Sequence, residues 1–322
     1  MTDRCSIAII GAGPTGLAAA WRLTELGCTD WQLFERDAQP GGLASSVVDA
    51  AGFTWDLGGH VLFSHYDYFD RLMQQALGDA WVEHIRESWV WIRDRWVPYP
   101  FQNNIWRLPE DDLWACLSGL INIWKHAEPA RGQPANFRDW LLASFGTGLC
   151  ETFMFPYNRK VWAYDPSLLN VEWMGERVAT VDVSRIVENL VRRRDDVSWG
   201  PNATFKFPMH GGTGAIWQAL FAQLPRERFQ LCDEVISIDG RKRVLKLASG
   251  RQVTYERAIS TMPRDLLLQR LEGETEIARQ ADHFVWSSSH IIGVGIKGQA
   301  PETLRTKCWM YFPEANTPFY RV

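Results

Sequence analysis

The N-terminal part of the chain has two short apolar runs separated by a glycine-rich turn and a segment with helical spacing. The first run, Ile7–Ile10, leads into the turn GAGPTG at residues 11–16. Apolar positions then recur at the spacing of a helix from Thr15 to Leu26. A second run, Trp31–Phe34, ends in Glu35. This order predicts a strand, a tight turn, a helix, a second strand and a terminal acid.

Each part of this pattern has a physical role in binding a dinucleotide. Gly11 allows the sharp turn, Gly13 lets the backbone approach a pyrophosphate, and Gly16 lets the helix lie close to the sheet. The helix N-terminus presents unpaired N–H groups to phosphate, and Glu35 is placed to accept a hydrogen bond from a ribose. The alternative is a glycine-rich turn in an unrelated α/β fold, because such motifs have false positives.

Beyond Glu35 the pattern predicts further strands and helices around additional glycine turns. We expect a hairpin over 47–56, helices over 66–77 and 215–224, and strands over 88–97, 204–207, 234–238, 244–247, 252–255, 258–261, 290–297 and 309–312. Between about 108 and 197 the segments are helical and are broken by prolines, which indicates an inserted helical region.

These elements predict an α/β fold with a doubly wound, Rossmann-like FAD-binding sheet, an inserted helical domain and an antiparallel substrate-domain sheet. FAD is favoured over NAD because the insertions supply loops that wrap a larger cofactor. We expect an FAD-binding domain at 1–83 and 203–265 and a helical insertion at 106–200. The substrate-domain sheet is expected at 84–105 and 266–322, incomplete at its C-terminus.

Composition narrows the class of protein. The chain has 322 residues, more than one core usually fills, and a formal net charge of −4, which argues against nucleic acid as a partner. We expect no signal peptide, because a strand begins almost at Met1, and no membrane span, because the apolar stretches are too short. The six cysteines show no CxxC pairing, as in a cytoplasmic protein with reduced thiols. No metal-ligand spacing is evident.

Several longer blocks carry a more specific signal. They are GGHVLFSHY at 58–66, WVPYPFQNN at 96–104, PYNRKVWA at 156–163, GERVA at 175–179, WGPNATF at 199–205, KCWMYFPE at 307–314 and PFYR at 318–321. Through these blocks, which run in order from end to end, the sequence resembles UDP-galactopyranose mutase of the eukaryotic type.

The resemblance implies a flavin-dependent isomerase of nucleotide sugars that serves glycan or cell-wall biosynthesis. In that family the N5 atom of reduced FAD attacks the anomeric carbon of UDP-galactopyranose, UDP leaves, and the sugar is returned to UDP as galactofuranose. There is no net oxidation, but NADPH or NADH must first reduce the flavin. The implied partners are UDP-galactose and UDP-galactofuranose.

The resemblance also assigns catalytic residues. Arg177 and Arg321 match the pair of guanidiniums that neutralises the departing pyrophosphate, for which the planar guanidinium is better suited than lysine. His60 matches a histidine on the flavin side. Without the surrounding blocks, a helix salt bridge would be the favoured interpretation of Arg177, and a histidine after a turn, such as His60, is more often a hydrogen-bonded structural residue.

Two further sets of residues follow from the motifs and the resemblance. The substrate-binding set is Tyr99, Phe101, Gln102, Asn158, Trp162, Asn202, Trp309 and Tyr311. Within it, Tyr99, Phe101 and Gln102 match a uracil site, although aromatic residues beside prolines more often serve packing. In a chain with 17 tryptophans, Trp162 and Trp309 are the members of the set that we would first reassign to the hydrophobic core. The cofactor-binding set is Gly11, Gly13, Thr15, Gly16, Glu35, Gly42, Leu43, Gly58, Gly59, His60 and Val235.

The resemblance has a gap at the C-terminus, because members of the family continue past Val322 with further tyrosines, an arginine and a flavin-binding segment. We therefore expect a truncated or split product that binds FAD weakly and turns over poorly alone. Two other functions stay open: an FAD-dependent oxidoreductase of the amine-oxidase-like superfamily, and an inactive nucleotide-binding fragment. The choice of NADH or NADPH, the downstream glycan and the oligomeric state, including a homo-oligomer, also stay open.

Overall fold

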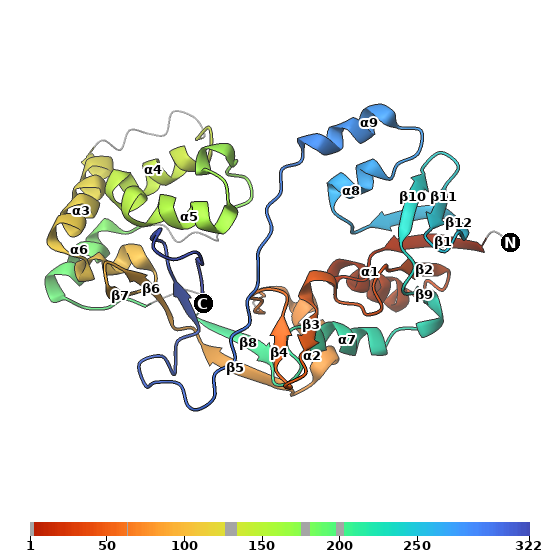
Figure 1. The fold of residues 1–322 in the computed structure, drawn as a ribbon, viewed down its shortest axis with the longest axis horizontal. Coiled ribbons are helices and arrows are strands. Elements are labelled where there is room, and N and C mark those ends of the chain that lie inside the picture. Colours follow the sequence, from red (N-terminus) through yellow and green to blue (C-terminus); the bar gives the residue numbers. More distant parts are fainter. Residues whose placement is uncertain (1–2, 63, 126–133, 175–180, 198–202) are drawn as a thin grey trace. The chain divides into compact units, whose positions relative to one another are not determined.

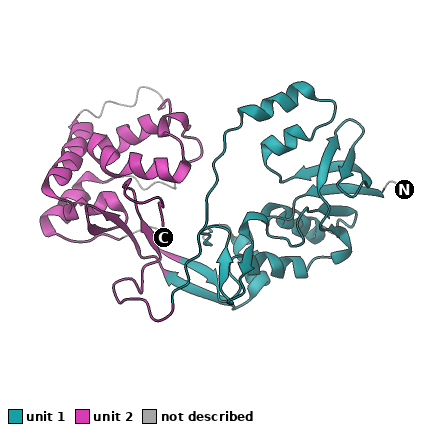
Figure 2. Cartoon of the chain, viewed as in Figure 1, with its two compact units in different colours: residues 1–84, 205–296 teal, residues 85–204, 297–322 magenta. Residues whose placement is uncertain are grey.

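The computed structural model describes residues 3–62, 64–125, 134–174, 181–197 and 203–322. The chain divides into two compact units (Figure 2). The first comprises residues 1–84 and 205–296, and the second comprises residues 85–204 and 297–322. The predicted helical insertion and the strands expected over 85–105 lie in the same unit, whereas residues 266–296 belong to the first.

The first unit is built on a six-stranded mixed sheet (Figure 1). Its strands, in spatial order, are β10 (Val235–Asp239), β11 (Val244–Leu247), β12 (Gln252–Ser260), β1 (Asp3–Ile10), β2 (Trp31–Phe34) and β9 (Phe229–Gln230). The strands from β12 to β9 are parallel, and β10 to β12 form an antiparallel meander. The predicted α/β fold with a parallel sheet around the glycine turn is therefore confirmed.

Strand β12 joins two strands that the sequence predicts as separate. Its first residues pair with β11, and along its length it runs parallel to β1, with Val253 opposite Asp3 and Ser260 opposite Ile10. The predicted parallel pairing of 258–261 is confirmed, but the predicted break after Tyr255 is wrong. Glu256 and Arg257 are polar yet remain in the ladder, because both are exposed and need no turn.

Helices cover both faces of this sheet. Leu17 and Ala20 of α1 (Pro14–Glu25) and Leu220 of α7 (Gly214–Ala222) pack on one face. Val235, Leu245 and their neighbours on the other face contact Leu267 of α8 (Arg264–Gln269). The remaining helices that we name in this unit are α2 (Asp67–Leu77) and α9 (Thr275–Arg279). Two further strand pairs are the hairpin of β3 (Ser46–Val48) with β4 (Thr54–Asp56) and the pair of β5 (Trp81–Ile85) with β8 (Thr204–Pro208).

The strand expected over 290–297 is absent from the structure, which corrects that prediction. Residues 285–299 are exposed and form no ladder with any described strand. Gly293 lies close to the Trp55 ring, since an added Cβ would be 2.6 Å from it, while Ile292 is 82% exposed. The described chain supplies no hydrogen-bonding neighbour for this segment.

The second unit combines helices with a small sheet. The helices are α3 (Glu110–Lys125), α4 (Phe137–Leu149), α5 (Phe155–Trp162) and α6 (Val183–Arg192), and the strands, in spatial order, are β13 (Trp309–Tyr311), β6 (Ser88–Ile92) and β7 (Arg95–Pro98). The single strand predicted over 88–97 is a hairpin, because Arg93 and Asp94 both adopt left-handed backbone angles, with φ of 52° and 57°. The usual glycine or asparagine signal of such a turn is missing.

The core of this unit brings the sheet against the helices. Val90 and Val97 of the hairpin, Phe101, and Phe145 of α4 are all fully buried in one cluster. Helices α3 and α4 cross closely at glycines, since a Cβ on Gly148 would lie 2.0 Å from the carbonyl oxygen of Ala115. No described helix is long and apolar enough to cross a membrane.

The cysteines give a direct check of this packing. Burial raises the pKa of Cys116 to about 11 and that of Cys150 to about 12, whereas Cys232 is exposed. Because the thiolate is the reactive form, we expect a disulfide reagent at mildly alkaline pH to modify Cys232 readily and to leave Cys116 and Cys150 unmodified until the chain unfolds. Mass spectrometry of the native protein measures this, and prompt labelling of Cys150 would contradict the packing described.

Candidate functional site

A cavity of about 590 Å³ lies in the first unit at the carboxyl ends of β1 and β2. Its lining includes seven of the residues predicted to bind cofactor: Gly11, Gly13, Thr15, Glu35, Gly42, Leu43 and Val235. The N-terminus of α1 opens onto it, since Gly13 is the N-cap residue and Pro14 the first helical residue. Unpaired N–H groups at this position suit an anionic phosphate.

The glycines at this turn leave no room for a side chain. A Cβ on Gly16 would lie 1.9 Å from the carbonyl oxygen of Gly11, so helix α1 packs on the turn itself. Gly11 has a φ of 101°, which strongly favours glycine. A Cβ on Gly42 would lie 3.1 Å from the Cα of Gly13, so two glycine turns approach each other across the cavity wall. These contacts form a cradle in which a pyrophosphate can approach the backbone closely.

Glu35 closes the cavity at the end of β2. Its Oε2 accepts a hydrogen bond of 2.6 Å from the Ala12 N–H, and its Oε1 accepts one of 3.0 Å from the Asp37 N–H. The side chain thus braces the glycine turn, and each oxygen keeps a lone pair for a further donor such as a ribose hydroxyl. The glycine cradle, the helix N-terminus and this carboxylate together fit a dinucleotide such as FAD.

Sequence reasoning missed part of the same cavity. Thr261, Met262 and Pro263 line it directly after β12, and Arg270 lines it from the end of α8. Arg270 donates to the Val235 carbonyl and to Glu234, both at 2.5 Å, and so fixes the start of β10. The signal that would find residues 261–263 is their place at the carboxyl end of a parallel strand beside β1, where ligands of such sheets bind.

His60 and the two glycines before it, Gly58 and Gly59, do not line this cavity. The imidazole of His60 packs on Gly58, where an added Cβ would lie 3.1 Å from its Cε1. The Nδ1 of His60 is buried and has no hydrogen-bond partner among the described residues. A buried ring nitrogen without a partner among the described residues is available to a ligand, and the role of His60 on the flavin side stays a prediction.

In the second unit, predicted substrate residues meet in an aromatic cluster. The ring of Tyr311 lies between those of Tyr99, at 5.3 Å, and Tyr157, at 5.4 Å. Burial raises the pKa of all three phenols, while the positive charge of Arg86 or Arg321 acts in the opposite direction. The three hydroxyls therefore stay protonated at neutral pH and can donate hydrogen bonds.

Arg321 contributes a cation to this tyrosine cluster. It bridges to Tyr311 of β13 as an antiparallel neighbour, and the Val322 N–H donates to the Met310 carbonyl at 2.9 Å. No ion pair joins Arg321 to a carboxylate anywhere in the described part of the chain, and its guanidinium lies 5.6 Å from the Tyr320 ring centroid. An unneutralised guanidinium beside phenol donors is an arrangement that attracts an anion.

The predicted uracil residues occupy different environments. Phe101 is fully buried and stacks on Phe153 with ring centroids 4.5 Å apart, so in this structure it serves packing. Gln102 is 2% exposed at the same loop. Tyr99 reaches the tyrosine cluster and donates its backbone N–H to Ser88. Tyr99 and Gln102 therefore lie in one loop in which Phe101 packs into the core, and their role in binding uracil stays a prediction.

The remaining substrate residues lie on α5 and β13. Asn158 donates to the Met154 carbonyl at 2.8 Å and accepts from the Trp162 indole at 3.2 Å, so it orients that ring. Trp309 lies under the guanidinium of Arg86, 4.7 Å from its ring centroid. Arg177 and Asn202 lie outside the described residues. No group of acidic, histidine or cysteine residues in the described ranges could hold a metal ion.

Lys160 was not singled out by the sequence, yet it organises the C-terminal turn. Its ammonium donates to the carbonyl oxygens of residues 312, 314, 317 and 319 and to the Thr317 hydroxyl. Burial lowers the pKa of Lys160, and the charge of Glu314 opposes that shift. Lys160 therefore ties α5, which carries Asn158, to the turn between Tyr311 and Arg321.

Replacing Lys160 by methionine tests this role. The variant keeps the aliphatic stem but leaves four carbonyls without their donor, so we expect the free energy of unfolding to fall by about 2 kcal/mol. We also expect faster proteolytic cleavage within 312–319, measured by mass spectrometry. Lys297→Met is the control, because Lys297 is exposed. Equal cleavage of both variants would show that Lys160 does not hold the turn.

Comparison with known proteins identifies a family and a close structural relative. The family model described as "Flavin containing amine oxidoreductase" matches residues 14–289. A crystal structure of reduced UDP-galactopyranose mutase is 50% identical, with a TM-score of 0.94 over 98% of this chain and 68% of that chain. This chain thus spans about two thirds of the length of that mutase.

Other matches are more distant. Cyclohexylamine oxidase from Brevibacterium oxydans is 19% identical with a TM-score of 0.58, over 86% of this chain and 63% of its own, and shows the fold alone. A zeta-carotene-forming phytoene desaturase from Myxococcus xanthus is 53% identical over 53 residues, which is 16% of this chain and 10% of the desaturase. That short match is confined to a small part of both proteins.

Proposed function

The chain belongs to the flavin-containing amine oxidoreductase family, as a member of its UDP-galactopyranose mutases, and on this basis we propose that it interconverts UDP-galactopyranose and UDP-galactofuranose. The observation that carries the proposal is Arg321, a guanidinium without a carboxylate partner in the described chain, beside the phenols of Tyr157 and Tyr311. Such a group suits a pyrophosphate, and an amine substrate would be repelled by it.

Reduced FAD, when bound, supplies a nucleophilic N5 atom for the anomeric carbon of the sugar. The residues of the chain provide binding and charge. The glycine cradle and the N-terminus of α1 hold the flavin's pyrophosphate, and Glu35 holds its ribose. Arg321, with Arg177, neutralises the negative charge that develops on UDP as it leaves and returns. The hydroxyl of Tyr311 donates a hydrogen bond to the pyrophosphate of that substrate.

The base and the sugar are assigned to the remaining predicted residues. Gln102 supplies an amide for the edge of the uracil beside Tyr99, with Phe101 packing behind the loop. Asn158, Trp162, Asn202 and Trp309 surround the sugar and pyrophosphate. His60 would face the flavin with its ring nitrogen, which has no partner among the described residues. NADPH or NADH would reduce the flavin before the first turnover. We place the protein in the cytoplasm. A homo-oligomer is one possible oligomeric state.

A second candidate function is oxidation of an amine or a polyene, favoured by the family match and by the likeness to an amine oxidase fold. Such an oxidase would use the same flavin cradle, but its reaction does not explain why Arg321 lies among phenols without a carboxylate partner in the described chain. Loss of activity with retained UDP binding would mark a third outcome, a nucleotide-binding protein without catalysis.

One assay separates the three. The flavin-loaded chain is incubated with UDP-galactofuranose under dithionite and under air, and UDP-galactopyranose is followed by chromatography. Conversion only under dithionite supports the mutase, whereas peroxide formation from an amine under air supports the oxidase. UDP binding without either activity supports the nucleotide-binding protein and overturns the proposed isomerase.

A further inference from the structure

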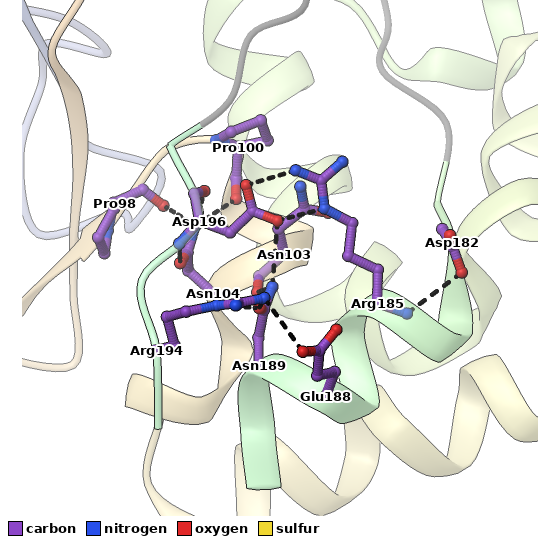
Figure 3. Close-up of polar contacts among 10 residues, drawn as sticks. All are labelled: Pro98, Pro100, Asn103, Asn104, Asp182, Arg185, Glu188, Asn189, Arg194 and Asp196. Carbon is purple, nitrogen blue, oxygen red and sulfur yellow. Dashed lines mark hydrogen bonds and ion pairs between the residues drawn. The ribbon is translucent and has the colours of Figure 1, made fainter. Parts of the chain in front are cut away.

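A buried polar cluster in the second unit surrounds Asn104 (Figure 3). Asn104 is fully buried, and its amide nitrogen donates to the carbonyl oxygens of Pro98 at 3.2 Å, Pro100 at 2.9 Å and Asp196 at 2.8 Å. Its amide oxygen accepts from the Asp196 N–H at 2.8 Å. All polar atoms of this side chain are therefore used, and the partners fix which atom is nitrogen and which is oxygen.

The other half of the cluster fixes Asp196 itself. Its carboxylate, 8% exposed at the residue level, pairs with the guanidinium of Arg185, whose Nη2 lies 2.7 Å from Oδ1. Asn189, fully buried on α6, donates to Asp196 and to the Asn103 carbonyl, each at 3.2 Å. Arg194 in turn donates to Asn189 at 3.2 Å. We name the residues Asn103, Asn104, Arg185, Asn189, Arg194 and Asp196 the asparagine cluster.

The asparagine cluster reaches the segments that carry the predicted UDP-binding residues. Pro98 and Pro100 flank Tyr99, and Gln102 lies between them and Asn104. Arg177 precedes α6 in the sequence, and Asn202 follows Asp196. The asparagine cluster therefore joins the base loop to α6, through Asn189, and to Asp196.

The chemistry of the base loop explains why it needs Asn104. Like other buried backbone carbonyls, those of Pro98 and Pro100 need hydrogen-bond donors. Asn104 donates to the Pro98 carbonyl, in the peptide before Tyr99, and shares the Pro100 carbonyl with the Asn103 N–H, which lies 3.1 Å from it. Removal of the side chain would break these contacts and the one to the Asp196 carbonyl, so the loop that carries Tyr99 and Gln102 would lose its tie to the Asp196 segment.

We propose that Asn104 is a positioning residue for recognition of the uracil base, acting through Tyr99 and Gln102. The inference rests on the proposed function, because it takes the 99–102 loop as the base site. It adds a specificity element that touches no ligand: the asparagine cluster fixes the base loop while Arg321, on another part of the unit, binds the pyrophosphate.

The test is Asn104→Ala, with binding of UDP, uridine and inorganic pyrophosphate measured separately by calorimetry on the flavin-loaded chain. We expect the affinity for UDP and for uridine to fall about tenfold, because the loop must then become ordered when the base binds. The affinity for pyrophosphate should stay unchanged. In turnover assays KM rises while kcat changes little. A general loss of structure would weaken all three ligands together.

Asn136→Ala is the matched control. Asn136 caps α4 in the same unit by accepting from the Asp139 N–H at 2.9 Å, and its loss lowers stability without a connection to the base loop. Asn104→Ser is the milder variant if Asn104→Ala does not fold. Unchanged uridine binding in Asn104→Ala or Asn104→Ser, or an equal loss for pyrophosphate, would overturn the proposal. A wild-type chain that binds pyrophosphate but neither UDP nor uridine would overturn the proposed function, and this role with it.

Discussion

The Gly16→Ala variant is expected to lose its flavin. The added Cβ would lie 1.9 Å from the carbonyl oxygen of Gly11, a backbone atom that cannot rotate away, so helix α1 must move off the turn. That movement shifts the helix N-terminus and the Gly13 backbone, which together form the phosphate cradle. Overpacking of this kind costs roughly 3 kcal/mol in stability as well. Flavin content after gel filtration, measured by absorbance, gives the readout.

The control for this variant is Gly240→Ala in the same unit. Gly240 lies in the turn between β10 and β11, has no positive φ, and an added Cβ there meets nothing within 4 Å. It should keep both its flavin and its stability. Gly16→Ala protein that binds flavin as well as the control would mean that α1 does not form the phosphate site.

Replacement of Arg321 by alanine is expected to slow turnover about a hundredfold, because loss of a group that stabilises developing charge costs about 3 kcal/mol. Arg321→Lys keeps the positive charge but loses the planar, bidentate geometry of the guanidinium, so this variant should keep only part of the wild-type rate. Initial rates with UDP-galactofuranose under dithionite provide the measurement. Arg177→Ala should show a loss of the same order.

Arg305→Ala serves as the control for this loss. Arg305 is exposed in the same unit and pairs with Glu302 at 3.6 Å, so its removal changes the net charge by the same amount without touching the tyrosine cluster. Its rate should equal that of the unmodified chain. Equal rates for Arg321→Ala and Arg305→Ala would show that Arg321 does not stabilise the leaving UDP.

The flavin cradle could be predicted in detail because its determinants are local. Gly11, Gly13 and Gly16 are set by short-range contacts within one turn, and Glu35 follows from the length of the second strand. Thr261 and Arg270 line the same cavity but come from distant parts of the chain. Their place depends on which strand neighbours β1, and a single sequence does not specify that pairing.

The errors in the fold have a similar cause. The hairpin turn at Arg93 and Asp94 uses left-handed residues that lack the glycine signal, so 88–97 reads as one strand. Residues 290–297 alternate as a strand does, but a strand needs a neighbour, and alternation says nothing about one. In the second unit, Lys160 and Asn104 act on backbone carbonyls brought together by the fold, which no periodicity reveals.

In the proposed reaction the flavin serves the isomerisation without being consumed as a redox reagent. The most direct measurement reduces the bound flavin once, without oxygen, and counts the molecules of UDP-galactofuranose converted per flavin while the flavin spectrum is recorded. We expect many conversions per flavin and a spectrum that remains that of the reduced state. At most one conversion per flavin, with return of the oxidised spectrum, would contradict it.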